Sequence, residues 1–134
     1  MLHKIEIRTK SKQEIIDITQ MIEELVKKNK WIDGVCFIYC PHTTCGVAIN
    51  EGADPSVKAD IINKLSELIP TDGDYLHLEG NSHSHIKSIL TGNSISIFIE
   101  NNKLELGRWQ SIYLLEFDGP RNRNILVKFL KSTF

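Results

Sequence analysis

Apolar and polar residues alternate along much of this chain with the period of two that is typical of half-buried strands. Strands are expected at six places: over residues 2–9, 35–40, 45–50, 95–99, 104–117 and 125–129. Short turn-forming stretches rich in Asp, Asn and Gly separate most of them, so the second half of the chain should consist mainly of consecutive hairpin-like strands.

Two longer helices are predicted by apolar residues spaced three and four positions apart. The first covers residues 12–29 and starts with the capping-box pattern Ser11-Lys12-Gln13-Glu14. The second starts at Asp54-Pro55, an N-cap followed by proline at the first helical position, and continues to Pro70. Each is expected to bury one face against the sheet.

A third, short helix is expected over residues 82–91, with Asn81 as its cap and Gly92 as its stop. Its apolar stripe is expected to face the core and consists of Ile86, Ile89 and Leu90. The whole pattern predicts an α+β fold, a compact sandwich with a largely antiparallel sheet, two longer helices and one short helix. At 134 residues the chain fits a single domain, 1–134, that can bury a core.

Charge and composition exclude several classes of protein. The net charge is −1, so no whole-protein field favours nucleic acid as a partner. No stretch approaches the roughly 18–20 apolar residues of a membrane span, and the N-terminus lacks a signal-peptide core. We therefore expect a cytoplasmic protein with no membrane partner. The cysteines, an odd count that argues against a disulfide framework, are Cys36, Cys40 and Cys45.

Three histidines stand at the edges of predicted elements, namely His42, His77 and His85. Imidazole is the commonest protein ligand for transition metals, and three protein ligands plus an open position make a typical catalytic metal site. If the three converge, a divalent ion is expected between them, and imidazoles suit Zn²⁺, Ni²⁺, Cu²⁺ or Fe²⁺. For each single histidine, a hydrogen-bonded core or surface residue is the alternative.

His83 and His85 cannot both be ligands of one ion if residues 82–91 are helical. Residues two apart on a helix point about 200° away from each other. His85 lies at the margin of the apolar stripe and can face a pocket while the stripe faces the core. We therefore choose His85 as the ligand and expect His83 at the surface, near the mouth of the site.

Several motifs and single residues stand in order along the chain: His42-Thr43-Thr44, Ile49-Asn50-Glu51, Ala53-Asp54-Pro55, Asp60, His77-Leu78-Glu79-Gly80-Asn81, His85, Leu106-Gly107-x-Trp109-Gln110 and Glu116-Phe117-Asp118-Gly119-Pro120-Arg121. Together they resemble the YjbQ family, also called UPF0047, from the first strand to the C-terminus. The resemblance implies an α+β sandwich that assembles as a homotrimer, with secondary thiamine-phosphate synthase activity. His83, where an acidic residue is more usual, and Arg108, where a small polar residue is more usual, depart from the family pattern.

The histidine motifs of the family imply His42, His77 and His85 as the metal ligands. His42 and Glu51 are the candidate catalytic residues. The carboxylate of Glu51 could act as a general base, a partner of a ligand imidazole or a direct ligand, or could instead cap the turn near Asp54.

Binding of a small phosphorylated metabolite is expected from Thr43, Thr44, Asn81, Lys87 and Arg121. The free N–H groups at the start of the helix over 82–91 suit phosphate. Arg121 could clamp a phosphate with its planar guanidinium or pair with Glu116 or Asp118.

Three functions stay open. The first is a thiamine-phosphate synthase, which joins a pyrimidine-methyl diphosphate to a thiazole phosphate and releases diphosphate. Mg²⁺ serves diphosphate chemistry but prefers oxygen ligands, whereas three imidazoles favour Zn²⁺. The second is a metal-dependent hydrolase with a metal-bound water as nucleophile and Glu51 as base. The third is a non-enzymatic, trimeric metal- or metabolite-binding protein.

Overall fold

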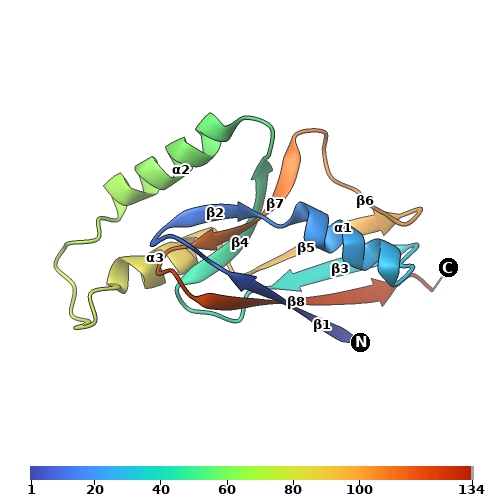
Figure 1. Cartoon of the computed structure of the whole chain (residues 1–134), viewed down its shortest axis with the longest axis horizontal. Coiled ribbons are helices and arrows are strands. Elements are labelled where there is room, and N and C mark those ends of the chain that lie inside the picture. Colours follow the sequence, from blue (N-terminus) through green and yellow to red (C-terminus); the bar gives the residue numbers. More distant parts are fainter. Residues whose placement is uncertain (134) are drawn as a thin grey trace.

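Two antiparallel sheets form the centre of the fold, and helices lie around them (Figure 1). The computed structural model describes residues 1–133. Its elements are β1 (Leu2–Arg8), β2 (Glu14–Asp17), α1 (Thr19–Lys28), β3 (Gly34–Tyr39), β4 (Cys45–Glu51), α2 (Pro55–Leu68), α3 (Ser82–Thr91), β5 (Ser94–Glu100), β6 (Lys103–Leu104), β7 (Gln110–Glu116) and β8 (Asn122–Lys131). The predicted α+β fold with largely antiparallel sheets is confirmed.

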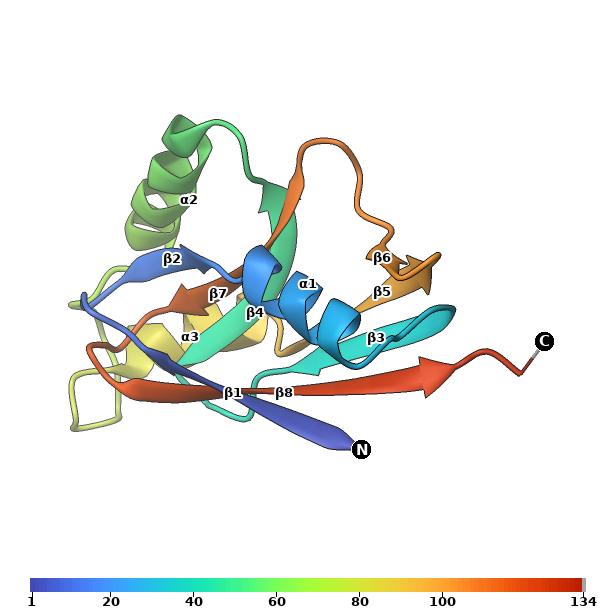
Figure 2. The ribbon, with the colours of Figure 1, turned by 45° about the vertical axis from the view of Figure 1, so that its right-hand side comes forward.

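The strand order is β1-β8-β3-β5-β6 in the larger sheet and β2-β7-β4 in the smaller one, and every ladder is antiparallel. The main core takes residues from both sheets and from α1, including Ile22, Ile38, Ile112 and Ile125. In Figure 2, α2 stands at the outer edge of the molecule, whereas α3 lies close to β4 and β7. No helix within residues 1–133 is long and apolar enough to cross a bilayer.

The predicted helix over 12–29 is wrong in its first part, because residues 14–17 form strand β2 and α1 begins only at Thr19. The neighbouring residues Ile15 and Ile16 pack against two different apolar clusters, as neighbours on a strand do when both faces are covered. Pairing of β2 with β7 fixes this arrangement. The helical spacing of the isoleucines therefore continues across an element boundary.

The capping-box pattern at residues 11–14 is used in a turn and not at a helix start. The carboxylate of Glu14 accepts hydrogen bonds from the backbone N–H groups of Lys10 (2.6 Å) and Ser11 (2.7 Å). The same side chain-to-backbone contact that closes a capping box thus closes the connection from β1 to β2.

Helix α3 lies with its polar face inward, contrary to the prediction. His83, Ser84, Lys87 and Ser88 are buried, whereas the apolar stripe faces outward, with Ile89 85% exposed. The expectation of a surface His83 is therefore wrong. The inward polar groups are satisfied: Ser84 Oγ donates to the Phe117 carbonyl (2.5 Å), and Ser88 Oγ donates to the Cys45 carbonyl (2.6 Å).

The predicted strand over 104–117 is also interrupted, because β6 ends at Leu104 and β7 begins only at Gln110. The segment between them turns around Gly107, whose N–H donates to Gln110 Oε1 (2.7 Å). Helix α2 matches its predicted start, where the Asp54 carboxylate accepts from Ser56 N–H, but none of its residues is buried. Its apolar face is only half covered within one chain.

Candidate functional site

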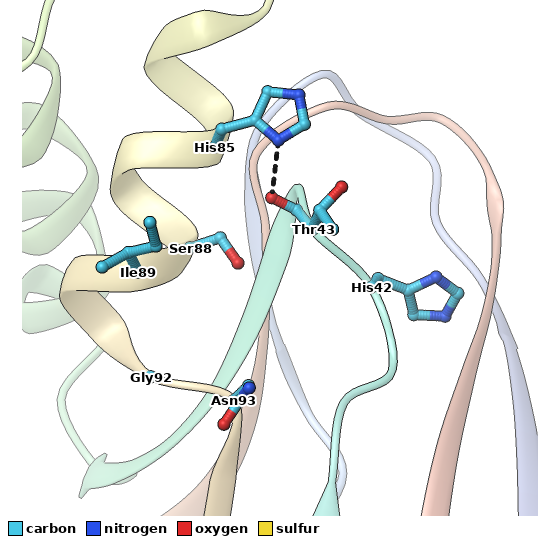
Figure 3. A pocket seen from close by; sticks show the side chains of 7 residues that line it. All are labelled: His42, Thr43, His85, Ser88, Ile89, Gly92 and Asn93. Atoms are coloured by element: carbon cyan, nitrogen blue, oxygen red, sulfur yellow. Dashed lines mark hydrogen bonds between the residues drawn. The ribbon is translucent and has the colours of Figure 1, made fainter.

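A hollow of about 430 Å³ lies between α3 and the turn that joins β3 to β4 (Figure 3). The turn contributes side chains from residues 42–43, and α3 with its C-terminal end contributes the others. The lining residues are His42, Thr43, His85, Ser88, Ile89, Gly92 and Asn93. Two of the three predicted metal ligands thus lie beside one cavity.

His85 is held by the turn across the hollow. Its Nδ1 lies 3.1 Å from the carbonyl oxygen of Thr43, so Nδ1 carries a proton and donates it to that bond (Figure 3). The neutral ring then keeps a free lone pair on Nε2. The ring of His77 stands edge-on to that of His85, with centroids 5.5 Å apart. His77 and His85 therefore form a pair of imidazoles at the rim of the site.

His42 is turned away from α3, toward β8 (Figure 3). Its Nε2 accepts a hydrogen bond from the backbone N–H of Asn124 at 2.9 Å. Burial, and after it the nearby charge of Arg123, lowers the pKa of His42, which keeps the ring neutral. A neutral imidazole has one lone pair, and here Asn124 occupies it. His42 as it lies fastens the turn to β8 and has no lone pair left for a metal.

Within a single chain, the histidine side chains are not arranged as the expected metal site of three imidazoles. Within residues 1–133, no group of three or more His, Cys, Asp or Glu side chains is placed so that it could hold one ion. The structure brings His77 and His85 together but directs His42 elsewhere. In the described part of the chain, no third side chain is placed to complete a metal site with His77 and His85.

Glu51 lies at the opposite end of β4 from the turn that carries His42. The strand runs from Cys45 to Glu51, which at about 3.3 Å per residue separates them by about 20 Å. The Glu51 carboxylate accepts from the N–H of Ala53 (2.7 Å), in agreement with the alternative that it caps this turn. Within one chain, Glu51 does not reach His42 or His85.

Asn81 and Arg121, two of the predicted phosphate-binding residues, meet at the buried carboxylate of Asp118. Oδ2 of Asp118 accepts from Asn81 Nδ2 (2.9 Å) and from Arg121 Nη2 (2.7 Å). Arg121 Nε also donates to the Asp118 carbonyl at 2.7 Å. Of the predicted pairings for Arg121, the structure shows the one with Asp118. The Gly-Pro turn pointed to this region, but no pattern in the sequence marked Asp118 as the residue that holds both side chains.

The side chain of Asn81 therefore does not cap α3, although the residue stands at the N-cap position. Its Oδ1 is buried and has no hydrogen-bond partner within residues 1–133. The N–H of Ser84 already donates to the Asn81 carbonyl (3.0 Å), so the anion-binding start of α3 keeps at most the N–H groups of Ser82 and His83. An unpaired buried acceptor calls for a donor, which a ligand or water can supply.

Thr44 and Lys87 lie deeper than predicted. Thr44 Oγ1 accepts from Arg123 Nη2 (2.8 Å), and the same guanidinium forms a buried ion pair with Glu116 at 2.5 Å. Burial alone would raise the pKa of Glu116, but hydrogen bonds from Arg123 and Thr9 lower it below its ordinary value. Sequence reasoning missed this ion pair, because two charges seven residues apart give no pattern that marks them as partners.

Lys87 is fully buried and faces away from the hollow. Its Nζ contacts His83 Nδ1 at 2.9 Å and Gln13 Oε1 at 3.2 Å. Of the five predicted phosphate-binding residues, Thr43 lines the hollow, Asn81 and Arg121 lie at the start of α3, and Thr44 and Lys87 make internal contacts.

Comparison with known proteins gives matches over almost the whole chain. The family model described as "UPF0047 protein YjbQ-like" matches residues 3–132. A UPF0047 protein of Methanocaldococcus jannaschii is 52% identical over 97% of this chain and 94% of its own length. The UPF0047 protein YugU of Bacillus subtilis is 43% identical over 97% of this chain and 99% of its own.

Solved structures show the same fold. A YjbQ/UPF0047 family protein of Clostridium acetobutylicum, described as uncharacterized, superposes with a TM-score of 0.93 at 48% identity, covering 96% of this chain and 99% of that one. A YbjQ-like protein of unknown function from Sulfolobus solfataricus gives a TM-score of 0.93 at 30% identity, covering 98% and 97%.

Proposed function

The chain belongs to the YjbQ-like UPF0047 family, and we propose that it is a transferase of small phosphorylated metabolites with thiamine-phosphate synthase activity. In this reaction a thiazole phosphate nitrogen attacks a pyrimidine-methyl carbon, and the C–O bond to diphosphate breaks. The protein's main tasks are to bind two phosphorylated molecules, orient them and stabilise the charge that develops on the leaving diphosphate.

The arrangement around Asp118 is the observation that carries this proposal. It holds Arg121 at the start of α3, using the Nε and Nη2 edges of the guanidinium and leaving Nη1 for a ligand. Asn81 Oδ1, unpaired and buried, offers an acceptor for a donor on the same ligand. Arg121 and the positive end of the α3 dipole suit the phosphate of one substrate or the diphosphate of the other, whereas Asn81 Oδ1 suits a hydroxyl or amino donor elsewhere on the ligand.

His85 is the residue we infer to exchange a proton with the reacting groups. Thr43 fixes the ring orientation, and the free Nε2 lone pair accepts a proton or, once protonated, donates one to the leaving oxygen. Thr43 and His85 both line the hollow, so a substrate there would touch both.

We further propose that a second copy of the chain completes the site in the homotrimer expected for this family. The outward face of α3 carries Ile86, Ile89 and Leu90 near the hollow, and the preceding segment exposes Leu76 and Leu78 almost fully. Apolar side chains gathered in this way are typical of protein interfaces. A neighbouring chain would cover them and could bring its own Glu51 toward His85, which the same chain cannot do.

A divalent ion fits this proposal only if a neighbouring chain or the substrate supplies part of its ligands. His77 and His85 could supply two imidazoles for Zn²⁺, and a neighbouring chain would have to supply the next ligand. If the ion is Mg²⁺, the diphosphate oxygens would be its main ligands. When bound, either ion would neutralise charge on the leaving group.

The hydrolase alternative has less support, because its proposed base, Glu51, lies about 20 Å from the turn of His42 within one chain. A turnover assay separates the two. The assembled protein is incubated with both thiamine precursors, with and without added Zn²⁺ or Mg²⁺, and beside a panel of phosphoesters and amides. Formation of thiamine phosphate supports the transferase. Hydrolysis of the panel without thiamine phosphate at any precursor concentration would overturn it.

A further inference from the structure

Cys40 and Cys45 bracket the turn that carries His42, and their Sγ atoms lie 3.1 Å apart. We propose that these thiols form an oxidisable pair, and that a small peroxide converts them to a disulfide that closes the His42 turn. This modification site is separate from the proposed transferase activity and does not depend on it.

The backbone on both sides of the turn holds the two sulfurs face to face. Cys40 follows β3, and its N–H donates to the Asn93 carbonyl at 2.7 Å. Cys45 opens β4 and pairs with Glu116 of β7. A disulfide bond is about 2.05 Å long, so the sulfurs need to approach by about 1 Å. A movement of this size lies within the reach of side-chain rotation and a small shift of a four-residue turn.

Access is limited to small oxidants. Both thiols are at most 1% exposed. The hollow adjoins this turn, because His42 and Thr43 line it and Ser88, another lining residue, donates a hydrogen bond to the Cys45 carbonyl. Hydrogen peroxide is only slightly larger than a water molecule and can follow this route when the turn opens slightly. A bulky disulfide such as oxidised glutathione cannot.

The chemistry balances with peroxide as the oxidant. The thiolate of one cysteine attacks a peroxide oxygen, the O–O bond breaks, and a sulfenic acid and one water form. The second sulfur attacks the sulfenic sulfur, the S–O bond breaks, and a second water leaves with the thiol proton. The two sulfurs together lose two electrons to the peroxide. A dithiol reductant reverses the modification by exchange.

Oxidation would restrict the turn between Cys40 and Cys45, which carries His42 and Thr43. The disulfide closes a ring from residue 40 to residue 45, with His42 and Thr43 inside it. Thr43 is the residue that holds His85, and His42 is the residue that fastens the turn to β8. The disulfide would thus restrict the movement of both contacts and give the protein two interconvertible forms.

Cys36 provides a control inside the same chain. It is buried in β3 opposite Ile97 and Phe129, and burial raises the pKa of its thiol to about 12. It therefore has almost no thiolate at neutral pH and should stay reduced.

The test uses the reduced full-length protein, treated with hydrogen peroxide, then denatured, alkylated and analysed by mass spectrometry. We expect one alkylated thiol, Cys36, and a peptide with Cys40 and Cys45 that is lighter by two hydrogen atoms. Dithiothreitol should restore three alkylatable thiols, and oxidised glutathione should act far more slowly than peroxide. The substitution Cys36→Ala should leave the disulfide unchanged, and Cys45→Ala should remove it.

Three results would overturn the proposal: three alkylated thiols after peroxide treatment of the folded protein, sulfinic acid at Cys40 or Cys45 in place of a disulfide, or a bond that involves Cys36. If Cys45→Ala does not fold, the wild type and Cys36→Ala still decide the question. Peroxide treatment in urea serves as a further control. The unfolded chain should give mixed pairings with Cys36, so exclusive pairing of Cys40 with Cys45 depends on the fold.

Discussion

The Nζ atom of Lys87 lies 2.9 Å from Nδ1 of His83, one turn earlier on α3, and both side chains are buried. The short contact fixes the state of the imidazole, because Nδ1 must be the acceptor when the ammonium donates. His83 Nε2 then carries the proton and lies 3.3 Å from Ser84 Oγ. Within residues 1–133, no carboxylate bonds to Lys87, whose other partner is Gln13 Oε1, and burial lowers the pKa of the amine.

The first prediction concerns the coupling between these two residues. Lys87→Met should leave His83 Nδ1 buried without a donor, and His83→Leu should leave the ammonium with Gln13 alone. Each should cost about 1–3 kcal/mol of unfolding free energy, the usual loss when one partner of a buried hydrogen bond is removed. The double variant should lose less than the sum of the two. Urea denaturation measures all three, and strictly additive losses would show that the contact contributes nothing.

The second prediction concerns pH. Burial, and after it the charge of Lys87, lowers the pKa of His83 below its ordinary value of about 6.5. The unfolded chain therefore binds this proton at higher pH than the folded protein. The free energy of unfolding is unaffected by this proton above about pH 6.5. It decreases as the pH falls toward the pKa of His83 in the folded protein, with a slope of at most about 1.4 kcal/mol per pH unit.

His83→Gln keeps an acceptor for Lys87 but cannot titrate in this range. The free energy of unfolding of this variant should fall less steeply than that of the wild type as the pH decreases from 6.5 to 5. The measurement is chemical denaturation at a series of pH values. An identical slope in the two proteins would mean that His83 does not contribute to acid destabilisation.

The third prediction compares two arginines on the same side of the molecule. Arg123→Met should cost about 3–5 kcal/mol of unfolding free energy, because it leaves the Glu116 carboxylate buried and unpaired. Arg121→Met is the matched control. The Arg121 side chain is half exposed, and after its loss the buried Asp118 carboxylate still accepts from Asn81 Nδ2, so the substitution should cost less, about 1–2 kcal/mol. Equal costs measured by denaturation would contradict the assignment of Arg123 as the internal support of the turn at Thr44.

The fourth prediction tests the outward face of α3. Ile89→Asp places a carboxylate at the most exposed position of the apolar stripe, and it should break the proposed homotrimer into smaller species without unfolding the chain. Leu2→Asp, at an exposed position on the edge strand β1, is the control and should leave the assembly intact. Sedimentation velocity gives the mass of each. A trimeric Ile89→Asp variant would show that subunits do not meet on this face.

Local sequence patterns predicted most helices and strands correctly where the element buries only one of its faces. The alternation of Ile95, Ile97 and Ile99 gave β5, and Asp54-Pro55 gave the start of α2, because pleat geometry and capping depend only on nearby residues. The same reasoning failed at Ile15 and Ile16. A strand with both faces covered has no single apolar side, so its residues merged with the helical spacing that follows.

The orientation of α3 could not be predicted from its own residues. Hydrophobic spacing assumes that the apolar stripe faces the core of the same chain, whereas here polar residues face inward and find partners on distant strands. Ser84 bonds to Phe117, and Ser88 bonds to Cys45. An apolar stripe that would be covered by another chain gives the same sequence pattern as one covered by the core.

The candidate site shows the same limit. Sequence motifs singled out His85, Thr43, Asn81 and Arg121, and the structure places all four around the start of α3 or its hollow. The roles of His42 and Glu51 depend on directions and distances that no motif contains. The lone pair of His42 is engaged by a backbone group 82 residues away.

The central claim is that the start of α3, with Arg121 and His85, binds and processes phosphorylated substrates. The most direct measurement is the initial rate of thiamine phosphate formation by the assembled protein and three variants: His85→Asn, Arg121→Gln and the control Lys131→Gln, which removes one positive charge at the end of β8 that lies farthest from Arg121. We predict product from the wild type, a loss of about 10²-fold or more in His85→Asn, a higher KM for both precursors or one of them in Arg121→Gln, and little change in Lys131→Gln. Full activity in both His85→Asn and Arg121→Gln would contradict the claim.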